Sequence, residues 1–411
     1  MVNTVYDYII IGAGLAGLYS AYLIKKCNPN INIIILEKEK KDWIGGRIGN
    51  EQFYNNEIVT GAGIGRKQKD YLLLSLLKTF NLPIINCSIQ MNYAKTIKNP
   101  VNILNILKFL KKKYKQNPSL NLTFKEFALP ILGKKLYKNF TICSGYTDYE
   151  KEDAFEVLFN YGFEDNNPGW DSFIVPWKKL VLKLIQFINP KNIKTLENII
   201  EIKKLTNNEK INIFEIINEN KNFYLSKNII IATTITSLVK LLPLFPIYKQ
   251  IKGQPFLRVY GKFSPESNNL LKHFIPYQTI VPGPLHKIIP LKNGVYMIAY
   301  TDNLGALSLK NNLENTLENR KLFEKLLEKS LGIEDCSLDL LEIKSFYWPI
   351  GTHYFKPLEN FKDRNEFLEK AQHPFPGIYV IGEMVSMNQG WTEGALESVE
   401  AIKKDILKGC I

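Results

Sequence analysis

The first forty residues constrain the fold of this chain more than any other stretch, because a short apolar run leads directly into a glycine-rich turn. Residues 6–11 are mostly apolar and β-branched, which is typical of a strand buried in a parallel sheet. Gly12, Gly14 and Gly17 follow with Gly-x-Gly-x-x-Gly spacing, and helical spacing continues after them. This order of strand, glycine turn and helix predicts the first half of a nucleotide-binding β-α-β unit.

A second apolar run at residues 31–36 completes this unit and ends at Glu37, twenty residues after Gly17. In such units the first glycine permits the tight turn, the second lets a pyrophosphate approach the backbone, and the third lets the helix pack closely. The unpaired N–H groups at the helix start, near Ala16, attract phosphate. The Glu37 carboxylate can accept hydrogen bonds from ribose hydroxyls. The segment therefore predicts a dinucleotide site in an α/β fold.

The composition fits a folded chain of two domains. The chain has 411 residues, of which 45% are hydrophobic and 12% aromatic, and this excludes a disordered or low-complexity protein. Its five cysteines include no Cys-x-x-Cys pair, so we expect no disulfide framework and no metal site. The N-terminus lacks a signal peptide, and no stretch reads as a membrane span. These features predict a soluble protein of the reducing intracellular, cytoplasmic compartment.

The net charge of +13 is divided into blocks of opposite sign. Residues 95–138 contain eleven lysines and one acid, and apolar residues at 103–114 follow helical spacing. We expect these lysines to form a solvated helix face; contact with an anionic surface or nucleic acid is the alternative, although no nucleic-acid motif supports it. Residues 145–165 contain seven carboxylates and one lysine. They either line an entrance that attracts polyamines or form a solvated surface that balances the lysines.

Residues 42–47 read Asp-Trp-Ile-Gly-Gly-Arg, and this motif resembles one in the flavin-containing amine oxidase superfamily. In that family the motif follows the ribose acid and lies against the pyrophosphate of FAD. The resemblance implies that Gly45 and Gly46 allow close approach of the backbone and that Arg47 supplies positive charge to the phosphates. The block at residues 144–149 also resembles amine oxidases encoded by large DNA viruses.

The C-terminal region resembles the segment that closes the FAD site in the same family. Residues 377–383 predict a buried strand that runs into a glycine turn and Glu383, and residues 390–398 open a helix. By resemblance, Glu383 contacts the ribityl-phosphate part of FAD, and the helix start faces the N1–C2=O edge of the flavin. Val399 departs from the glycine that the family usually has, which should alter helix packing only.

Two further segments are assigned to the cofactor by resemblance. The glycine cluster at residues 61–66 falls where the family passes a loop beside the flavin, with an ordinary flexible loop as the alternative. Ile200 falls where a backbone group meets the adenine. The residues expected to bind FAD are therefore Gly12, Gly14, Ala16, Gly17, Glu37, Gly45, Gly46, Arg47, Gly63, Ile64, Ile200, Gly382, Glu383, Trp391, Thr392 and Ala395. We expect noncovalent FAD, because no cysteine occurs between Tyr347 and Tyr354, where covalently flavinylated members carry theirs.

The resemblance implies a two-domain, Rossmann-like FAD-binding fold of the amine oxidase type. The FAD-binding domain would be discontinuous and comprise residues 1–85, 190–250 and 376–411. An α+β substrate domain would be inserted twice, at residues 86–189 and 251–375.

The catalytic candidates also come from the resemblance. In this family two aromatic rings sandwich the amine above the flavin, and Trp391 and Tyr354 fall at these positions, with His353 as a less favoured candidate. For Tyr354, a core aromatic residue with a bonded hydroxyl is the alternative. Arg258 falls where the family often has a lysine bonded through water to flavin N5. Arginine is not an equivalent replacement, so Arg258 would pair with an acidic substrate or partner, or with a buried carboxylate.

These residues imply an FAD-dependent oxidase that acts on a small-molecule amine, with hydride transfer to flavin N5 and reoxidation by oxygen. Arg258 favours an alternative, in which the same fold acts as a desaturase or oxidase of a non-amine substrate. A flavoprotein retained for binding or structure is the third possibility.

Overall fold

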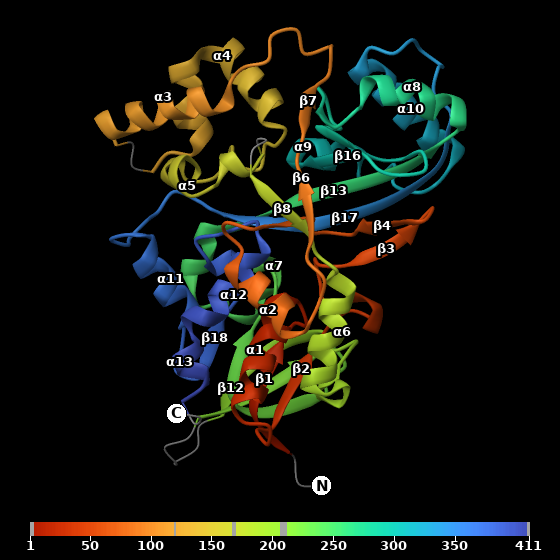
Figure 1. The fold of residues 1–411 in the computed structure, drawn as a ribbon. Coiled ribbons are helices and arrows are strands. Elements are labelled where there is room, and N and C mark those ends of the chain that lie inside the picture. Colours follow the sequence, from red (N-terminus) through yellow and green to blue (C-terminus); the bar gives the residue numbers. More distant parts are fainter. Residues whose placement is uncertain (1–3, 119–120, 167–169, 206–211, 409–411) are drawn as a thin grey trace.

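The computed structural model describes residues 4–118, 121–166, 170–205 and 212–408, and its lower part in Figure 1 is built on a seven-stranded sheet. Five strands of this sheet run parallel, and β10 and β11 add an antiparallel edge. The strand order is β10 (Ile199–Leu205), β11 (Ile213–Asn218), β12 (Phe223–Ile231), β1 (Val5–Ile11), β2 (Ile33–Leu36) and β9 (Ile193–Lys194), and β18 (Ile378–Val380) also pairs with β12.

The parallel strands are apolar on both faces because helices cover both sides. Successive side chains of a strand point to opposite faces, and Ile10 and Ile35 pack in one cluster whereas Ile9 and Ile34 pack in another. The first cluster includes α1 (Leu15–Cys27), α2 (Tyr71–Thr79), α6 (Trp177–Ile188), α12 (Thr392–Ala401) and α13 (Lys403–Ile406). The second includes α7 (Ile235–Leu241) and α11 (Arg364–Gln372).

A second, mostly antiparallel sheet of six strands lies above the first in Figure 1. Its strand order is β17 (Leu340–Phe355), β13 (Ile251–Phe263), β16 (Val295–Asp302), β15 (Lys287–Pro290), β14 (Gln278–Ile280) and β7 (Met91–Tyr93). The helices packed in its core cluster are α8 (Pro265–Phe274), α9 (Asn303–Leu309) and α10 (Leu317–Leu331). The long strands β13 and β17 lie above the first sheet in this view, so the second sheet covers one end of the nucleotide-binding unit.

Three helices form a separate layer beside the second sheet: α3 (Ile103–Gln116), α4 (Phe124–Ser144) and α5 (Ala154–Phe159). The helix predicted for the lysine-rich block is confirmed as α3, which buries Leu107 and Leu110. Lys108, Lys112 and Lys113 are exposed. Thr123 and Glu126 form a capping box that fixes the start of α4.

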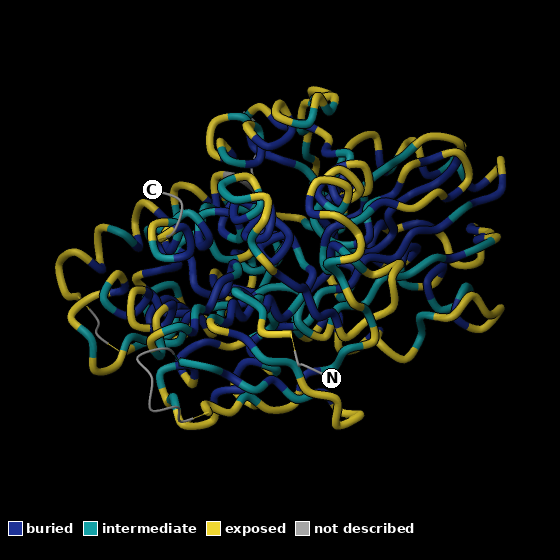
Figure 2. Tube along the Cα trace, turned by 90° about the horizontal axis from the view of Figure 1, so that it is seen from below, coloured by how far each residue is buried: buried dark blue, intermediate teal, exposed yellow. Residues whose placement is uncertain are grey.

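Short strands join these layers. β3 (Asn50–Phe53) pairs with β4 (Asn56–Val59), and β8 (Asp171–Ile174) pairs with both β5 (Ile64–Arg66) and β6 (Ile85–Ser88). Figure 2 shows the buried stretches in the interior and the exposed loops around the periphery. No helix in the described ranges is long and apolar enough to cross a membrane.

The cysteine prediction needs one correction. Cys27, at the end of α1, is disulfide-bonded, whereas Cys87, Cys143 and Cys336 are free thiols. The absence of Cys-x-x-Cys spacing excludes only close pairs, so it could not exclude a bond between residues far apart in the sequence.

Candidate functional site

A cavity of about 870 Å³ runs along the junction of the two sheets and carries both glycine-rich signatures on its wall. One end is lined by the turn after β1 and by the end of β2, and the other by β13, β15 and β17. The segments after β18 close it from a third side. Regions that are hundreds of residues apart in the sequence therefore share one elongated site.

The glycine turn after β1 has no room for a side chain at its first and third glycines. Gly12 has a φ of 106°, and a Cβ atom there would lie 2.6 Å from the carbonyl oxygen of Ala232. A Cβ atom on Gly17 would lie 2.1 Å from the carbonyl oxygen of Gly12. No side chain caps α1, so its first N–H groups remain available beside Gly14 and Ala16, which line the cavity. This geometry suits an anion such as a pyrophosphate.

Glu37 is buried at the end of β2 and lines the same end of the cavity. Its Oε2 atom accepts a hydrogen bond from the Ala13 N–H at 2.7 Å, and its Oε1 atom accepts one from the Glu39 N–H at 2.9 Å. These bonds fix the carboxylate and leave lone pairs that can accept ribose hydroxyl groups.

Ile200 does not line the cavity and is exposed, whereas its neighbour Ile199 is buried and lines it. Side chains alternate along a strand, so these two residues face opposite sides of β10. The contact predicted at Ile200 is made by a backbone group and stays a prediction, and Ile199 is the neighbour whose side chain faces the cavity.

The Gly-Gly-Arg loop packs against the glycine turn. The Gly45 N–H donates to the Ala13 carbonyl at 2.9 Å, and Gly46 comes close to the Cα atom of Gly14. Arg47 Nη1 donates to the Glu383 carboxylate at 2.7 Å and to the Gly351 carbonyl at 2.8 Å. The guanidinium group therefore connects the N-terminal loop, β17 and the C-terminal segment at the cavity wall.

Glu383 is the centre of a buried polar cluster. Its carboxylate accepts hydrogen bonds from Arg47, from His353 Nδ1 and, at 3.1 Å, from the Gly390 N–H. His353 Nε2 accepts the Ile235 N–H at 3.2 Å, so Nδ1 must carry the proton that is donated to Glu383. Burial opposes the charge of Glu383, but His353 and Arg47 together lower its pKa below the usual value. Burial also lowers the pKa of His353, which fits a neutral imidazole.

Trp391 lines the cavity at the start of α12, together with Thr392 and Ala395. The Arg66 guanidinium stacks on the Trp391 ring, with Cζ 3.7 Å from the ring centroid. Asp70 holds Arg66 through bonds of 2.9 Å from Nε and 2.6 Å from Nη2 to the same Oδ1 atom, and both side chains are buried. The buried Arg66 side chain, held by Asp70, therefore fixes the orientation of the Trp391 ring.

Tyr354 does not line the cavity. The neighbouring residues His353 and Phe355 are buried and line it, and Tyr354 points to the opposite side of β17. The strand also gives Tyr347 and Trp348 to the cavity wall. The Trp348 Nε1–H donates to the Thr60 carbonyl at 2.8 Å. The position predicted for Tyr354 is therefore corrected, and its partly buried ring fits the alternative of a packing residue.

Arg258 lines the cavity, and only 5% of the residue is exposed. Its Cζ atom lies 4.0 Å from the centroid of the Tyr300 ring, and its Nη1 atom lies 3.5 Å from the Met297 sulfur. A Cβ atom on Gly63 would lie 3.4 Å from Nη2, so the guanidinium is next to the loop assigned to the flavin. The sequence did not reveal Lys287, which is 2% exposed and also lines the cavity.

The acidic block is largely buried. Asp148, Glu152 and Glu156 are buried and line the cavity. Glu156 pairs with Arg364 at 3.0 Å, and Asp148 accepts a hydrogen bond from the Tyr161 hydroxyl. The expectation of a solvated surface is therefore wrong for these carboxylates.

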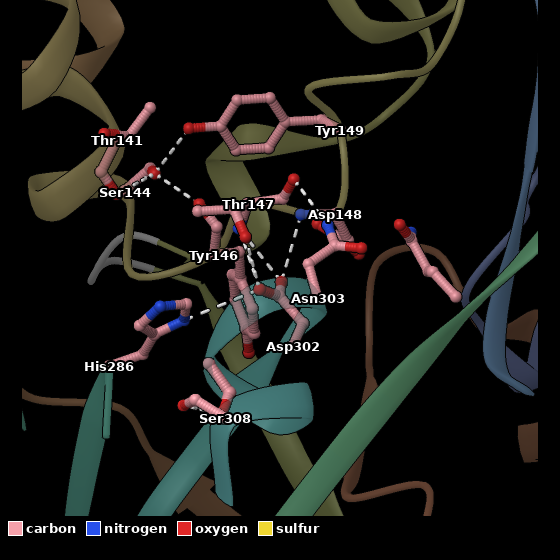
Figure 3. A network of polar contacts seen from close by, with 12 residues as sticks. Thr141, Ser144, Tyr146, Thr147, Asp148, Tyr149, His286, Asp302, Asn303 and Ser308 are labelled. Atoms are coloured by element: carbon pink, nitrogen blue, oxygen red, sulfur yellow. Dashed lines mark hydrogen bonds and ion pairs between the residues drawn. The ribbon is translucent and has the colours of Figure 1, made fainter. Parts of the chain in front are cut away.

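Asp302 organises the same region, as Figure 3 shows. It accepts the Thr147 and Asp148 N–H groups at 2.9 and 3.0 Å and the Thr147 hydroxyl at 2.6 Å, and it lies 3.5 Å from His286 Nδ1. No group of three or more histidine, cysteine, aspartate or glutamate side chains in the described parts of the chain could hold a metal ion.

The comparisons with known proteins agree with this geometry. A model of the NAD(P)-binding Rossmann-like domain matches residues 10–71. An uncharacterized protein of Acanthamoeba polyphaga mimivirus is 33% identical over 57 residues, a match that covers 14% of this chain and 11% of the viral protein.

Solved structures match over nearly the full length. A putrescine oxidase with redesigned cofactor binding superimposes with a TM-score of 0.75 at 12% identity, covering 98% of this chain and 99% of the other. Cyclohexylamine oxidase from Brevibacterium oxydans gives a TM-score of 0.74 at 13% identity, covering 99% of each chain. A protein from Exiguobacterium assigned as a protoporphyrinogen oxidase gives 0.70 at 14% identity, covering 99% of this chain and all of the other.

The chain is thus an α/β protein with a Rossmann-like dinucleotide-binding unit. Over nearly its full length the chain has the fold of solved amine oxidases, as the two sequence signatures predicted.

Proposed function

We propose that this protein is an oxidoreductase that binds FAD noncovalently and oxidises the carbon–nitrogen bond of a small-molecule amine. The observation that carries the proposal is the continuous cavity that joins the glycine turn, the Glu383 cluster and Trp391. When bound, FAD supplies the hydride acceptor, its N5 atom, and reacts with oxygen to complete the cycle. The fold shared with amine oxidases supports the same class of chemistry.

The residues at the nucleotide end fit the cofactor. The N–H groups at the start of α1 would bind the pyrophosphate, and Glu37 would accept the ribose hydroxyls. The start of α12, at Thr392, has no side-chain cap and would face the flavin edge with its unpaired N–H groups. Among the described residues no cysteine lines the cavity, and both nitrogen atoms of His353 are engaged, which supports noncovalent binding.

The residues at the other end would position the substrate and exclude water. Trp391, fixed by Arg66, would form one aromatic wall, and Tyr347 and Trp348 would supply others from β17. Aromatic walls of this kind orient a substrate carbon against the flavin while the cavity stays dry.

We also propose that the division of the chain follows the two sheets. Residues 1–85, 190–250 and 376–411 would bind FAD, and residues 86–189 and 251–375 would bind the substrate. The strands of the first sheet lie in the first group of segments and those of the second sheet almost entirely in the other group. The helix α6, at the end of one substrate segment, packs on α1 and extends the cofactor-binding core.

The visible spectrum of the purified protein tests the cofactor and the activity together. We expect flavin bands near ~370 and ~450 nm that bleach when a suitable amine is added without oxygen. A panel of primary, secondary and polyamines would be tested, and peroxide would be measured after air is admitted. A yellow protein that none of these amines reduces would refute amine oxidation but not flavin binding.

A non-amine substrate is the second candidate, and the buried Arg258 is the observation that favours it. We expect the variant Arg258→Lys to separate the two. Faster flavin reduction by amines in this variant would argue against the second candidate, because lysine would then restore amine chemistry at that position.

A further inference from the structure

Two basic side chains, Arg258 and Lys287, line the cavity beside the Tyr300 ring. Arg258 and Lys287 are 5% and 2% exposed. Among the residues that the structure describes, no carboxylate forms an ion pair with either side chain. The neighbours of Arg258 are the Tyr300 ring, the Met297 sulfur and the Tyr260 hydroxyl. A thioether is a weak acceptor, so most N–H donors of the Arg258 guanidinium have no strong acceptor among the described protein groups.

The two cations face the same part of the cavity. The Lys287 Nζ atom lies 3.2 Å from the centroid of the Tyr146 ring and 5.5 Å from that of the Tyr300 ring. The two tyrosine rings meet edge to face, with centroids 5.5 Å apart, and Arg258 covers the Tyr300 ring. The two basic side chains and the two tyrosine rings therefore alternate along one wall of the cavity. Phe256 extends this wall, and its ring centroid lies 5.3 Å from that of Tyr300.

Three carboxylates lie in the same region. Asp302 is fully buried and accepts hydrogen bonds from Thr147 and Asp148 (Figure 3). Burial and the proximity of Asp302 raise the pKa of Asp148 to about 7. Burial also raises the pKa of Glu152 well above its usual value. Burial lowers the pKa of Lys287 well below its usual value, whereas the nearby Asp302 and Asp148 act in the opposite direction. Arg258 is therefore the buried cation of this wall, and among the described residues it forms no ion pair with a carboxylate. An unpaired buried charge is costly in general.

We propose that Arg258 and Lys287 form an anion-binding subsite and that the substrate carries a carboxylate group beside its oxidised carbon. This inference rests on the proposed function, because it assigns the substrate class of the same cavity. A carboxylate matches the planar fork of an arginine in two parallel hydrogen bonds. The substrate class is thus a carboxylate-bearing amine of the amino acid type, and a polyamine, which is purely cationic, would be repelled.

Ligand binding tests the subsite without requiring turnover. Benzoate and the isosteric neutral benzamide would be titrated into the purified protein at constant ionic strength. The thermal unfolding midpoint and the visible flavin spectrum would be recorded. We expect saturable stabilisation by benzoate, and at least tenfold weaker binding of benzamide, since a charged hydrogen-bonded pair contributes about 1.5–3 kcal/mol.

Matched variants assign the effect to the two side chains. Arg258→Met and Lys287→Met should each weaken benzoate binding at least tenfold, and Arg258→Lys should recover part of it. Arg320→Gln removes one positive charge from α10, outside the cavity lining, and should leave benzoate binding unchanged. If Arg258→Met does not fold, the comparison of benzoate with benzamide on the unaltered protein still decides the question.

The possible outcomes separate this inference from the proposed function. Equal binding of benzoate and benzamide, or benzoate binding that survives Arg258→Met, would overturn the subsite. A variant that loses flavin but keeps benzoate-dependent stabilisation would also overturn it, because Arg258 would then serve the flavin. A protein that binds benzoate through Arg258 but contains no flavin would refute the proposed function alone.

Discussion

The buried cluster around Glu383 provides a quantitative test of how the two ends of the chain are joined. The variant Glu383→Gln keeps the size of the side chain but removes its charge. It also replaces one acceptor oxygen by a donor amide, which would face Arg47 or the protonated Nδ1 of His353. Glutamine can therefore accept hydrogen bonds from only some of the three donors that bond to the carboxylate.

The magnitude follows from the bonds that are lost. A hydrogen bond to a charged group contributes about 1.5–3 kcal/mol, and two of these bonds come from Arg47 and His353. Breaking a fully buried pair costs about 3–5 kcal/mol in general. The side chain of Arg47 is 29% exposed and can regain water, so the lower end applies. We expect Glu383→Gln to lower the free energy of unfolding by about 3 kcal/mol.

Urea unfolding of the flavin-free protein, followed by far-ultraviolet circular dichroism, measures this change without a contribution from the cofactor. The control is Glu201→Gln, which removes an exposed carboxylate that pairs with Lys203 and should change stability by less than about 1 kcal/mol. Because the pKa of Glu383 is lowered in the folded state, its stabilisation is present above pH 4.5 and is lost as the pH falls further. A variant within about 0.5 kcal/mol of the unaltered protein at pH 7 would refute the reasoning.

Three further predictions concern single side chains. Glu37→Gln should weaken FAD binding about tenfold, through the loss of a charged acceptor for ribose, as measured by the flavin retained on dialysis. Trp391→Ala should slow anaerobic flavin reduction by up to about 10²-fold with the flavin spectrum retained, whereas Trp391→Phe should be milder; unchanged rates would exclude the ring from substrate positioning. Burial raises the pKa of Glu393 to about 7, so this group makes the free energy of unfolding fall as the pH rises from 4.5 to 7. Glu393→Gln should reduce that fall, as measured by urea unfolding midpoints across this pH range. A pH dependence equal to that of the unaltered protein would count against the assignment.

The sequence predicted the parts of the site that depend on backbone geometry. Gly12 and Gly17 lie where a Cβ atom would collide with a carbonyl oxygen, so the close approach of helix to strand requires glycine at both positions. Local patterns therefore predicted the Rossmann-like unit, which the match over residues 10–71 confirms. Glu383 lines the same cavity as Gly12 and Gly14, and its contact with FAD stays a prediction.

The substrate end was less predictable, because it depends on which face of a strand points inward. Tyr354 and Ile200 were each assigned one residue away from a neighbour that lines the cavity. Lys287 gave no signal, since a lysine in an apolar stretch resembles any edge or surface residue until the packing is known. Likewise, the acidic block seemed a surface feature by composition, although tertiary contacts bury Asp148 and Glu152.

The bond between Arg47 and Glu383 joins residues 336 positions apart. During synthesis the glycine turn therefore leaves the ribosome long before Glu383 and Trp391, which line the same cavity. A chain that has been synthesised only as far as the glycine turn would have one wall of this cavity without the other. Under the function proposed above, flavin would stabilise only chains that extend beyond both residues.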